Sequence, residues 1–215
     1  MLVLASNSPR RKQLLSLGGW EFQVLPVDID ESQHDNENAE KYVSRLAQEK
    51  ANAAALHVPP WSLVIAADTC VVDGDKILGK PSNEREAWEM LKQLQGRMHQ
   101  VYTAICGLDA DTRLTISDLC RTDVMMRSYS EEEISTYIAS GDPLDKAGAY
   151  AIQHRGFDPV EKIEGCYANV VGLPLCHLGR ILQKFDISSK TDITINCQES
   201  LQYTCSIKDM VLLEE

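Results

Sequence analysis

One run of ten residues constrains the fold of this chain more than any other feature. Residues 63–67 (LVIAA) are apolar at every position, and residues 70–72 (CVV) resume the pattern after Asp68 and Thr69. A strand that is apolar on both faces is typical of the centre of a sheet that is covered on both sides. Because helical patterns alternate with strand patterns along the rest of the chain, the sequence predicts an α/β fold.

Asp68 is the unusual residue of this predicted central strand. A carboxylate is costly to bury unless a cation pairs with it or it binds a metal ion. Open α/β sheets bind ligands beyond the ends of their strands, which is where such an interruption could fall. We interpret Asp68 as a functional residue; an aspartate at this position by structural chance is the alternative.

The opening of the chain predicts an anion site. Residues 2–5 (LVLA) suit a short buried strand, and Pro9 is a favoured first residue of a helix. Arg10 and Arg11 then fall on the first helical turn, where the helix dipole and the free N–H groups already favour an anion. A phosphate chain would explain two cations at this end of a helix. A capped surface helix with two solvated arginines is the alternative.

Helical spacing of apolar residues predicts further helices, one of which carries Lys50 on or beside its buried stripe. The stem of Lys50 should point into the body of the protein, although lysine stems also cover apolar surface on their way to water. We expect helices at about 39–55, 83–94 and 174–185, and one more opened by a capping box at 130–133. We expect strands at 21–25, 101–108 and 114–126, with short candidates at 150–152 and 160–163. Residues 186–215 fit nothing firmly and could add strands or hang as a tail.

Composition excludes several classes of protein. A chain of 215 residues with a formal net charge of −11 lacks the basic surface of a general nucleic-acid-binding protein, but a small basic cluster suits a small anionic ligand. The first apolar run is too short for a signal peptide, and no apolar stretch is long enough to span a membrane. Seven cysteines without a C-x-x-C pair are expected to be reduced, in a cytoplasmic protein.

Six motifs follow one another over residues 2–185. They are Ser6-x-Ser8-Pro9-Arg10-Arg11, Ala67-Asp68-Thr69, Gly79-Lys80-Pro81, Gly96-Arg97-x-His99, Asp145-Lys146-Ala147-Gly148-x-Tyr150-x-Ile152-Gln153 and Asn169-Val170-Val171-Gly172-Leu173-Pro174. In this order they resemble the Maf family, septum-formation-inhibitor-like proteins that act as nucleoside triphosphate pyrophosphatases. The chain departs from the family at Cys166, where an aspartate is frequent, and in its last thirty residues.

The resemblance implies a two-lobed α/β fold with a mixed sheet, similar to that of inosine triphosphate pyrophosphatase, with a nucleotide cleft between the lobes. It assigns residues 1–185 to the pyrophosphatase domain and leaves residues 186–215 as an extension of unknown structure. A homodimer is an expectation from the resemblance alone.

The resemblance also assigns site residues by motif. The triphosphate would be held by Ser8, Arg10, Arg11, Lys50 and Lys80. A divalent Mg²⁺ or Mn²⁺ ion would be bound by Glu31 and Asp68, with Asp68 as general base. The branch of the family that acts on dTTP and UTP is indicated by Arg11, Thr69 and Gln153. Without the resemblance, Glu31 would be read as a solvated charge among neighbouring acidic residues.

The predicted reaction is attack of water on a nucleoside triphosphate, which gives the monophosphate and pyrophosphate. Its catalysis consists mostly of neutralising the phosphate charge and placing one water molecule. Asp68 could act as base, metal ligand or both. The amide of Gln153 could read the O4 and N3–H edge of thymine or uracil. The alternative function is a non-catalytic nucleotide-binding regulator of cell division, and it differs because such a protein needs neither Asp68 nor Glu31.

Overall fold

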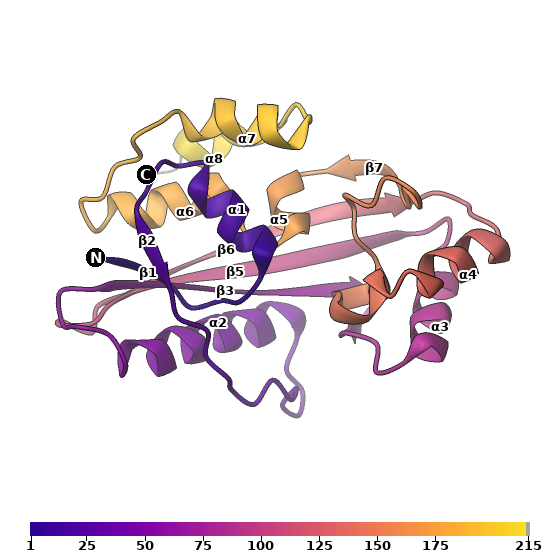
Figure 1. Cartoon of the computed structure of the whole chain (residues 1–215), viewed down its shortest axis with the longest axis horizontal. Helices are drawn as coiled ribbons and strands as arrows, with labels where there is room; N and C mark the ends of the chain where they lie inside the picture. The colour runs from indigo at the N-terminus through magenta and orange to yellow at the C-terminus, as the bar shows by residue number, and fades with distance from the viewer. Residues whose placement is uncertain (214–215) are drawn as a thin grey trace.

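The computed structural model of the protein describes residues 1–213 and is built on a seven-stranded mixed sheet (Figure 1). The strands are β1 (Leu2–Leu4), β2 (Phe22–Val24), β3 (Leu63–Asp73), β4 (Lys76–Leu78), β5 (Met98–Asp109), β6 (Thr115–Met126) and β7 (Val160–Glu164). Their order across the sheet is β2-β1-β3-β5-β6-β7, and β4 pairs with β3 off this path.

The helices are α1 (Pro9–Ser16), α2 (Ala39–Ala55), α3 (Glu84–Leu94), α4 (Glu131–Ala139), α5 (Tyr167–Val171), α6 (Leu175–Gln183), α7 (Ile193–Leu201) and α8 (Lys208–Leu213). Two short 3-10 helices, η1 (Asp142–Asp145) and η2 (Ala147–Ala149), lie between α4 and β7. No helix within residues 1–213 is both long enough and apolar enough to cross a membrane.

The predicted central strand is confirmed as β3, which lies between β1 and β5. It runs parallel to β1, with Val3 opposite Val64, and antiparallel to β5. The pairing with β5 continues through Asp68 and Thr69, so these two residues do not break the strand. Every residue of β3 except Thr69 is buried, as the apolar pattern predicted. Asp68 therefore lies in the middle of a covered sheet.

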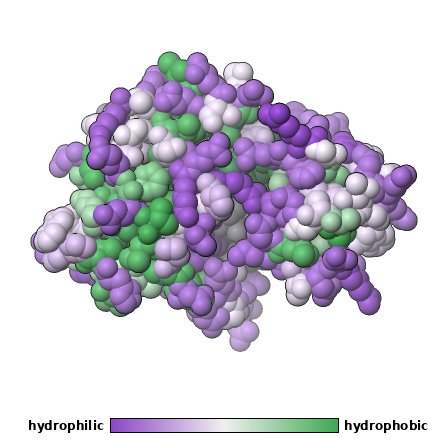
Figure 2. Space-filling view, viewed as in Figure 1, coloured by the Kyte–Doolittle hydropathy of each residue, from purple (hydrophilic) through white to green (hydrophobic). Residues whose placement is uncertain are grey.

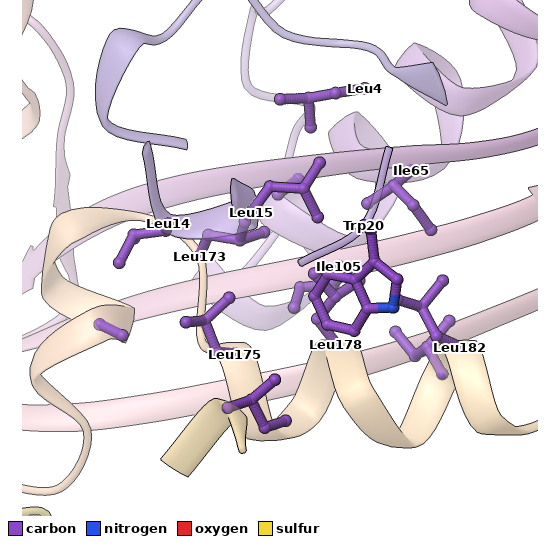
Figure 3. Packing of buried hydrophobic residues seen from close by; sticks show 14 of the residues in the cluster. Leu4, Leu14, Leu15, Trp20, Ile65, Ile105, Leu173, Leu175, Leu178 and Leu182 are labelled. Carbon is purple, nitrogen blue, oxygen red and sulfur yellow. The ribbon is translucent and has the colours of Figure 1, made fainter. Parts of the chain in front are cut away.

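Helices cover both faces of the sheet in the larger lobe. Helix α2 lies along one face, where its alanines pack against β3 and β5 (Figure 1). The other face is covered by α1, α5 and α6, and the leucines of α1 and α6 meet Trp20 and the central strands (Figure 3). The indole N–H of Trp20 donates to the carbonyl of Ser188 at 3.1 Å, which ties the segment after α6 to this core.

A smaller lobe lies at the far end of the long strands β3, β5 and β6, on the right in Figure 1. Its core joins α3 and α4 to the segment before β7, where the rings of Tyr137 and Phe157 stack at 4.4 Å. The mixed sheet with two lobes confirms the predicted fold class. Because the same strands run from one lobe into the other, the two lobes share one sheet.

Local signals located several elements correctly. The capping box is present, since Ser130 Oγ accepts from the Glu133 N–H and the Glu133 carboxylate accepts from the Ser130 N–H. The predicted strand at 160–163 is β7. The strand predicted at 150–152 is wrong, because this segment is irregular. There the Ala151 N–H donates to the Tyr137 hydroxyl at 3.0 Å rather than to a neighbouring strand.

Residues 186–213 form two helices that pack on α6, so both the expected strands and the expected tail are wrong. Asp192 begins α7 by accepting hydrogen bonds from the N–H groups of Thr194 and Ile195. Ile193 is buried in the larger core, and the ring of Tyr203 lies 5.3 Å from that of Tyr167. An aspartate cap and a few apolar contacts therefore decide the structure of this segment. All seven cysteines carry free thiols.

Candidate functional site

A cavity of about 680 Å³ lies where the loop after β1, the middle of β3 and the smaller lobe meet. Its polar lining contains Ser6, Ser8, Arg10, Arg11, Glu31, Lys50, Asp68, Thr69, Lys80, Asp145 and Lys146. Hydrophilic residues gather over the middle of the face seen in Figure 2, with hydrophobic areas on both sides of them. The predicted site residues thus come from segments far apart in the sequence, and all except Gln153 line this cavity.

The loop after β1 delivers the start of α1 to the cavity. Ser8 is the N-cap of α1, because its hydroxyl accepts from the Arg11 N–H at 3.3 Å, and Pro9 follows in the first turn. The Ser8 N–H in turn donates to the hydroxyl of Ser6 at 3.2 Å. The predicted helix start is confirmed, and it carries Arg10 and Arg11 on the first turn where an anion would be favoured.

The Arg11 guanidinium is held from two directions. Its Nε donates to the carbonyl of Gly172 at 2.8 Å, and its Nη2 donates to Thr69 Oγ1 at 3.0 Å. Gly172 has a φ of +114°, and a Cβ there would lie 3.3 Å from Thr69 Oγ1, so a side chain at this position would be strained and crowded. Burial lowers the pKa of Arg11, although Asp68 and Glu31 oppose that shift. An arginine nevertheless stays charged in a protein.

A buried hydrogen-bond network holds Thr69. Thr69 Oγ1 lies 2.9 Å from Thr103 Oγ1, which donates to the Asn169 carbonyl at 3.0 Å. The Asn169 amide donates to the Val101 carbonyl at 3.0 Å and to Thr122 Oγ1 at 2.8 Å. Asn169 is fully buried. Because each of these groups is held by a hydrogen bond to the next, the network fixes the orientation of the Thr69 hydroxyl toward Arg11.

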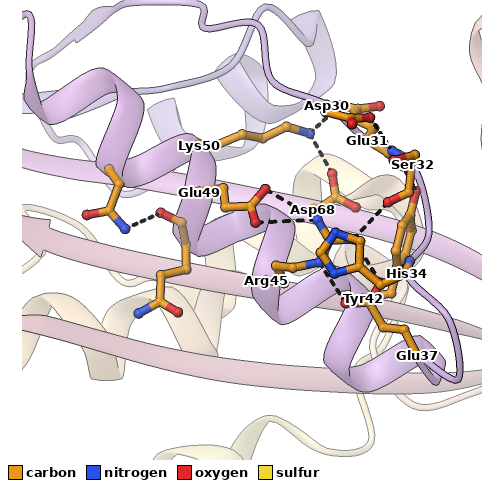
Figure 4. A network of polar contacts seen from close by, with 12 residues as sticks. Asp30, Glu31, Ser32, His34, Glu37, Tyr42, Arg45, Glu49, Lys50 and Asp68 are labelled. Carbon is orange, nitrogen blue, oxygen red and sulfur yellow. Dashed lines mark hydrogen bonds and ion pairs between the residues drawn. The ribbon is translucent and has the colours of Figure 1, made fainter.

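Lys50 joins the two candidate metal ligands. Its Nζ lies 2.6 Å from Asp68 Oδ1 and 2.6 Å from Glu31 Oε1 (Figure 4). The side chain of Asp68 is 10% exposed, whereas that of Glu31 is 45% exposed. The predicted orientation of Lys50 is confirmed, since this residue is buried on the face of α2 that meets the sheet.

The two carboxylates on Lys50 have opposite pKa shifts. Burial raises the pKa of Asp68 above its ordinary value, against the influence of Lys50 and Arg11. Burial also opposes ionisation of Glu31, but the hydrogen bond and charge of Lys50 outweigh it and lower the pKa of Glu31. Lys50 therefore contacts one carboxylate, that of Asp68, whose pKa is raised, and another, that of Glu31, whose pKa is lowered. The raised pKa suits Asp68 to accept a proton.

The remaining predicted cations lie at the rim. Lys80 Nζ is 3.9 Å from Glu31 Oε2, and the Lys80 side chain is largely exposed. Arg10 Nη2 is 3.9 Å from Asp145 Oδ2. These pairs are loose, so both cations are available to a polyanionic ligand.

Gln153 is the exception among the predicted site residues. It is exposed, in the irregular segment between η2 and β7, and lies outside the residues that line the cavity.

Lys146 and Tyr42 are among the lining residues that received no role from the sequence. Lys146 is buried at the cavity, where its Nζ lies 2.9 Å from Asp142 Oδ1 and also contacts Asp145. Its membership of the fifth motif was the only signal. Tyr42 lines the cavity from α2 and donates to the Glu31 carbonyl at 2.8 Å. Burial raises the pKa of Tyr42 to about 12, so it remains a donor at neutral pH.

Of the described carboxylates that line the cavity, those of Glu31 and Asp68 meet at Lys50, whereas that of Asp145 pairs with Arg10 and Lys146. Within residues 1–213, no group of three or more histidine, cysteine, aspartate and glutamate side chains could hold a metal ion. Mg²⁺ is often bound by one or two carboxylates, with the rest of its shell from water and substrate phosphates. The pair therefore fits a hard divalent cation that arrives with a phosphate ligand.

Comparison with known proteins agrees with the motif order. The model of the Maf-like protein family matches residues 1–185. The dTTP/UTP pyrophosphatase of Geobacillus sp. (strain WCH70) is 48% identical over 183 residues, which cover 85% of this chain and 97% of that protein. The dTTP/UTP pyrophosphatase of Salmonella typhimurium (strain LT2) is 46% identical over 185 residues, which cover 86% of this chain and 93% of that protein.

Among solved structures, the Ham1 protein of Staphylococcus aureus aligns with a TM-score of 0.46 and 17% identity, over 94% of this chain and 95% of that chain. The family match spans both lobes and every segment that contributes to the cavity. The chain therefore belongs to the Maf-like protein family.

Proposed function

We propose that this protein hydrolyses dTTP and UTP to the monophosphate and pyrophosphate. One observation carries the proposal: a buried carboxylate, Asp68, lies in a cavity of triphosphate size among Arg10, Arg11, Lys50 and Lys80. The relatives that match most of the chain are named dTTP/UTP pyrophosphatases, which supports the choice of substrates.

The cations and the helix start would hold the triphosphate. Arg10 and Arg11 present forked donors that match phosphate oxygens, and Lys50 and Lys80 act as point charges. Ser8 adds a hydroxyl at the N-terminus of α1. Because a triphosphate repels an incoming nucleophile, neutralising its charge is the larger part of the catalysis that these residues supply.

Asp68 would accept the proton of the attacking water. Its burial raises its pKa and so makes its carboxylate a stronger base than an exposed aspartate. Lys50 holds the carboxylate in place at 2.6 Å.

Glu31 and Asp68 would also hold a divalent cation, Mg²⁺ or Mn²⁺, together with the phosphates. When bound, the ion neutralises phosphate charge and lowers the pKa of a coordinated water. With the ion bound to the two carboxylates, Lys50 would be free to pair with phosphate. Asp68 can serve as base, as ligand or as both.

Selection of the pyrimidine nucleotides would rest on Arg11, Thr69 and Gln153. Arg11 and Thr69 are bonded to each other at the cavity wall. Gln153 is exposed and outside the lining, so its proposed role in reading the base rests on the family resemblance.

We further propose that the protein acts in the cytoplasm, where its nucleotide substrates and reduced thiols are expected, and that it forms a homodimer. The net charge of −11 argues against nucleic acid as a partner. The free thiols of all seven cysteines agree with a reducing compartment.

A non-catalytic nucleotide-binding regulator of cell division is the alternative, but it has no need for a buried base beside a second carboxylate. The decisive experiment measures pyrophosphate release from dTTP, UTP, CTP and 7-methyl-GTP, with and without added Mn²⁺. We expect turnover of dTTP and UTP that depends on the metal. Binding of dTTP without any release of pyrophosphate would favour the regulator.

A further inference from the structure

The segment that carries Glu31 has little structure of its own. Residues 25–38 link β2 to α2 and form neither helix nor strand along their whole length. Most of these residues are exposed, Glu31 included. Hydrogen bonds within the segment, such as that of the Glu37 N–H to the His34 carbonyl at 3.2 Å, do not involve the Glu31 carboxylate. The position of this carboxylate at the cavity therefore depends on side chains that reach the segment from elsewhere.

Helix α2 supplies those side chains (Figure 4). The Tyr42 hydroxyl donates to the Glu31 carbonyl at 2.8 Å, and Arg45 Nη2 donates to the Ser32 carbonyl at 2.9 Å. Lys50 holds the Glu31 carboxylate itself at 2.6 Å. One helix therefore fixes two successive carbonyl groups of the segment as well as the side chain of Glu31.

Arg45 makes the stronger of the two backbone anchors, because it also binds Glu37 at the end of the segment. Its Nε and Nη2 donate to the two oxygens of Glu37 at 2.7 Å and 2.8 Å. The Glu37 carboxylate accepts a third bond, from the His34 N–H at 3.0 Å, and its side chain is only 8% exposed. Hydrogen bonding from Arg45 lowers the pKa of Glu37 to about 2, so the pair stays charged at neutral pH.

We propose that Arg45 is a positioning residue for Glu31. Arg45 lies outside the residues that line the cavity and acts by closing residues 32–37 into a turn that presents Glu31 to Lys50 and Asp68. A guanidinium suits this task because it can bind both oxygens of one carboxylate and a carbonyl at once, which an ammonium group cannot do with the same geometry. The inference deepens the proposed function and rests on it.

The test is a double-mutant cycle on dTTP hydrolysis with Arg45→Met, Glu31→Gln and the pair together. If Arg45 acts through Glu31, Arg45→Met lowers kcat/KM by about tenfold to a hundredfold in the wild-type background. In the Glu31→Gln background, Arg45→Met lowers kcat/KM by less than about twofold. Arg45→Lys should restore only part of the loss, because the fork is missing.

The matched control is Arg85→Met. Arg85 pairs with Glu89 one turn along the exposed face of α3, as Arg45 pairs with Glu49 on α2, and it does not line the cavity. We expect the control to leave kcat/KM within about twofold of wild type. Glu37→Gln removes the other half of the anchor without touching α2, and it should reproduce the direction of the Arg45→Met effect if that variant fails to fold.

Hydrogen exchange separates this inference from the proposed function. Arg45→Met should speed amide exchange in residues 28–38 and leave β3 unchanged, whether or not the protein turns over dTTP. A wild-type protein that releases no pyrophosphate would contradict the proposed function, and the exchange data would still test the anchor. Equal losses of kcat/KM in both backgrounds, or unchanged exchange in residues 28–38, would overturn the role of Arg45.

Discussion

The two walls of the cavity are built in different ways. The wall formed by Arg11 and Thr69 is backed by a buried chain of hydrogen bonds through Thr103 and Asn169. The wall formed by Glu31 belongs to an irregular, exposed segment that ion pairs hold on α2. The first wall is therefore part of the core, and the second is attached to it.

This difference separates stability from activity. Breaking a buried network costs folding free energy, whereas the half-exposed ion pair of Glu31 with Lys50 contributes little to it. Changes in the first wall should therefore destabilise the protein as well as impair it. Changes in the second wall should impair the site and leave the fold intact.

Asp68 lies between the two walls, and its substitution should have the largest effect on turnover. Loss of a general base costs about 10²- to 10⁴-fold, so Asp68→Asn should reduce pyrophosphate release from dTTP to that extent. Binding of dTTP, measured by calorimetry, should remain because the cations are untouched. Asp73→Asn is the matched control, since Asp73 is also buried on β3 but pairs with Gln93 and Arg97 away from the cavity. Equal turnover in Asp68→Asn and wild type would reject Asp68 as the base.

Asn169→Ala tests the core wall. It removes two buried hydrogen bonds, to the Val101 carbonyl and to Thr122 Oγ1, which should lower the free energy of unfolding by about 2–3 kcal/mol although Thr122 keeps its bonds to the Cys166 backbone. Glu31→Gln in the attached wall should lower it by less than about 1 kcal/mol, because the ion pair of Glu31 with Lys50 is half exposed. Both values follow from urea denaturation. The comparison fails if the two variants lose the same stability.

The two carboxylates on Lys50 should change stability with opposite signs. The raised pKa of Asp68 means that the folded protein holds its proton more tightly than the unfolded chain, so its contribution to stability falls as pH rises through that window. The lowered pKa of Glu31 gives a contribution present above its unfolded pKa and lost as pH falls through the folded one. At pH 7, Asp68→Asn should therefore raise the unfolding free energy and Glu31→Gln should lower it, each by about 1 kcal/mol or less. Urea denaturation at pH 7 measures the sign of each change in unfolding free energy. A lower unfolding free energy in Asp68→Asn would contradict the raised pKa of Asp68.

Gln153 lies outside both walls, and the smallest effect is expected there. Gln153→Glu replaces an amide donor by a carboxylate, which should lower kcat/KM for dTTP and UTP by about tenfold or less if the residue reads the base. CTP, which presents a different edge, supplies the reference substrate. If the ratio of kcat/KM for dTTP to kcat/KM for CTP does not change, Gln153 does not take part in recognition of the base.

Local chemistry in the chain was sufficient for the elements that build the core wall. The apolar run of β3, the Pro9 start of α1, the capping box at Ser130 and the inward direction of Lys50 all follow from neighbouring residues. The strand expected at 150–152 failed because a tyrosine hydroxyl from α4 satisfies that backbone. The helices after residue 186 were missed because Ile193, Ile195 and Cys197 alternate with polar residues as in a strand, and because α8 has only six residues.

By itself the sequence determined where the long strands and several helix starts lie, because apolar periodicity and capping act over a few residues. Apart from the family resemblance, only the tertiary structure brings Glu31 to the cavity, since its segment is polar and irregular and its place depends on Tyr42, Arg45 and Lys50 of α2. The sequence placed Arg11 at a helix start that favours an anion, but only the tertiary structure shows its partners Thr69 and Gly172, which are distant in the chain. Contacts between residues so far apart depend on how the elements pack, and no local pattern specifies them.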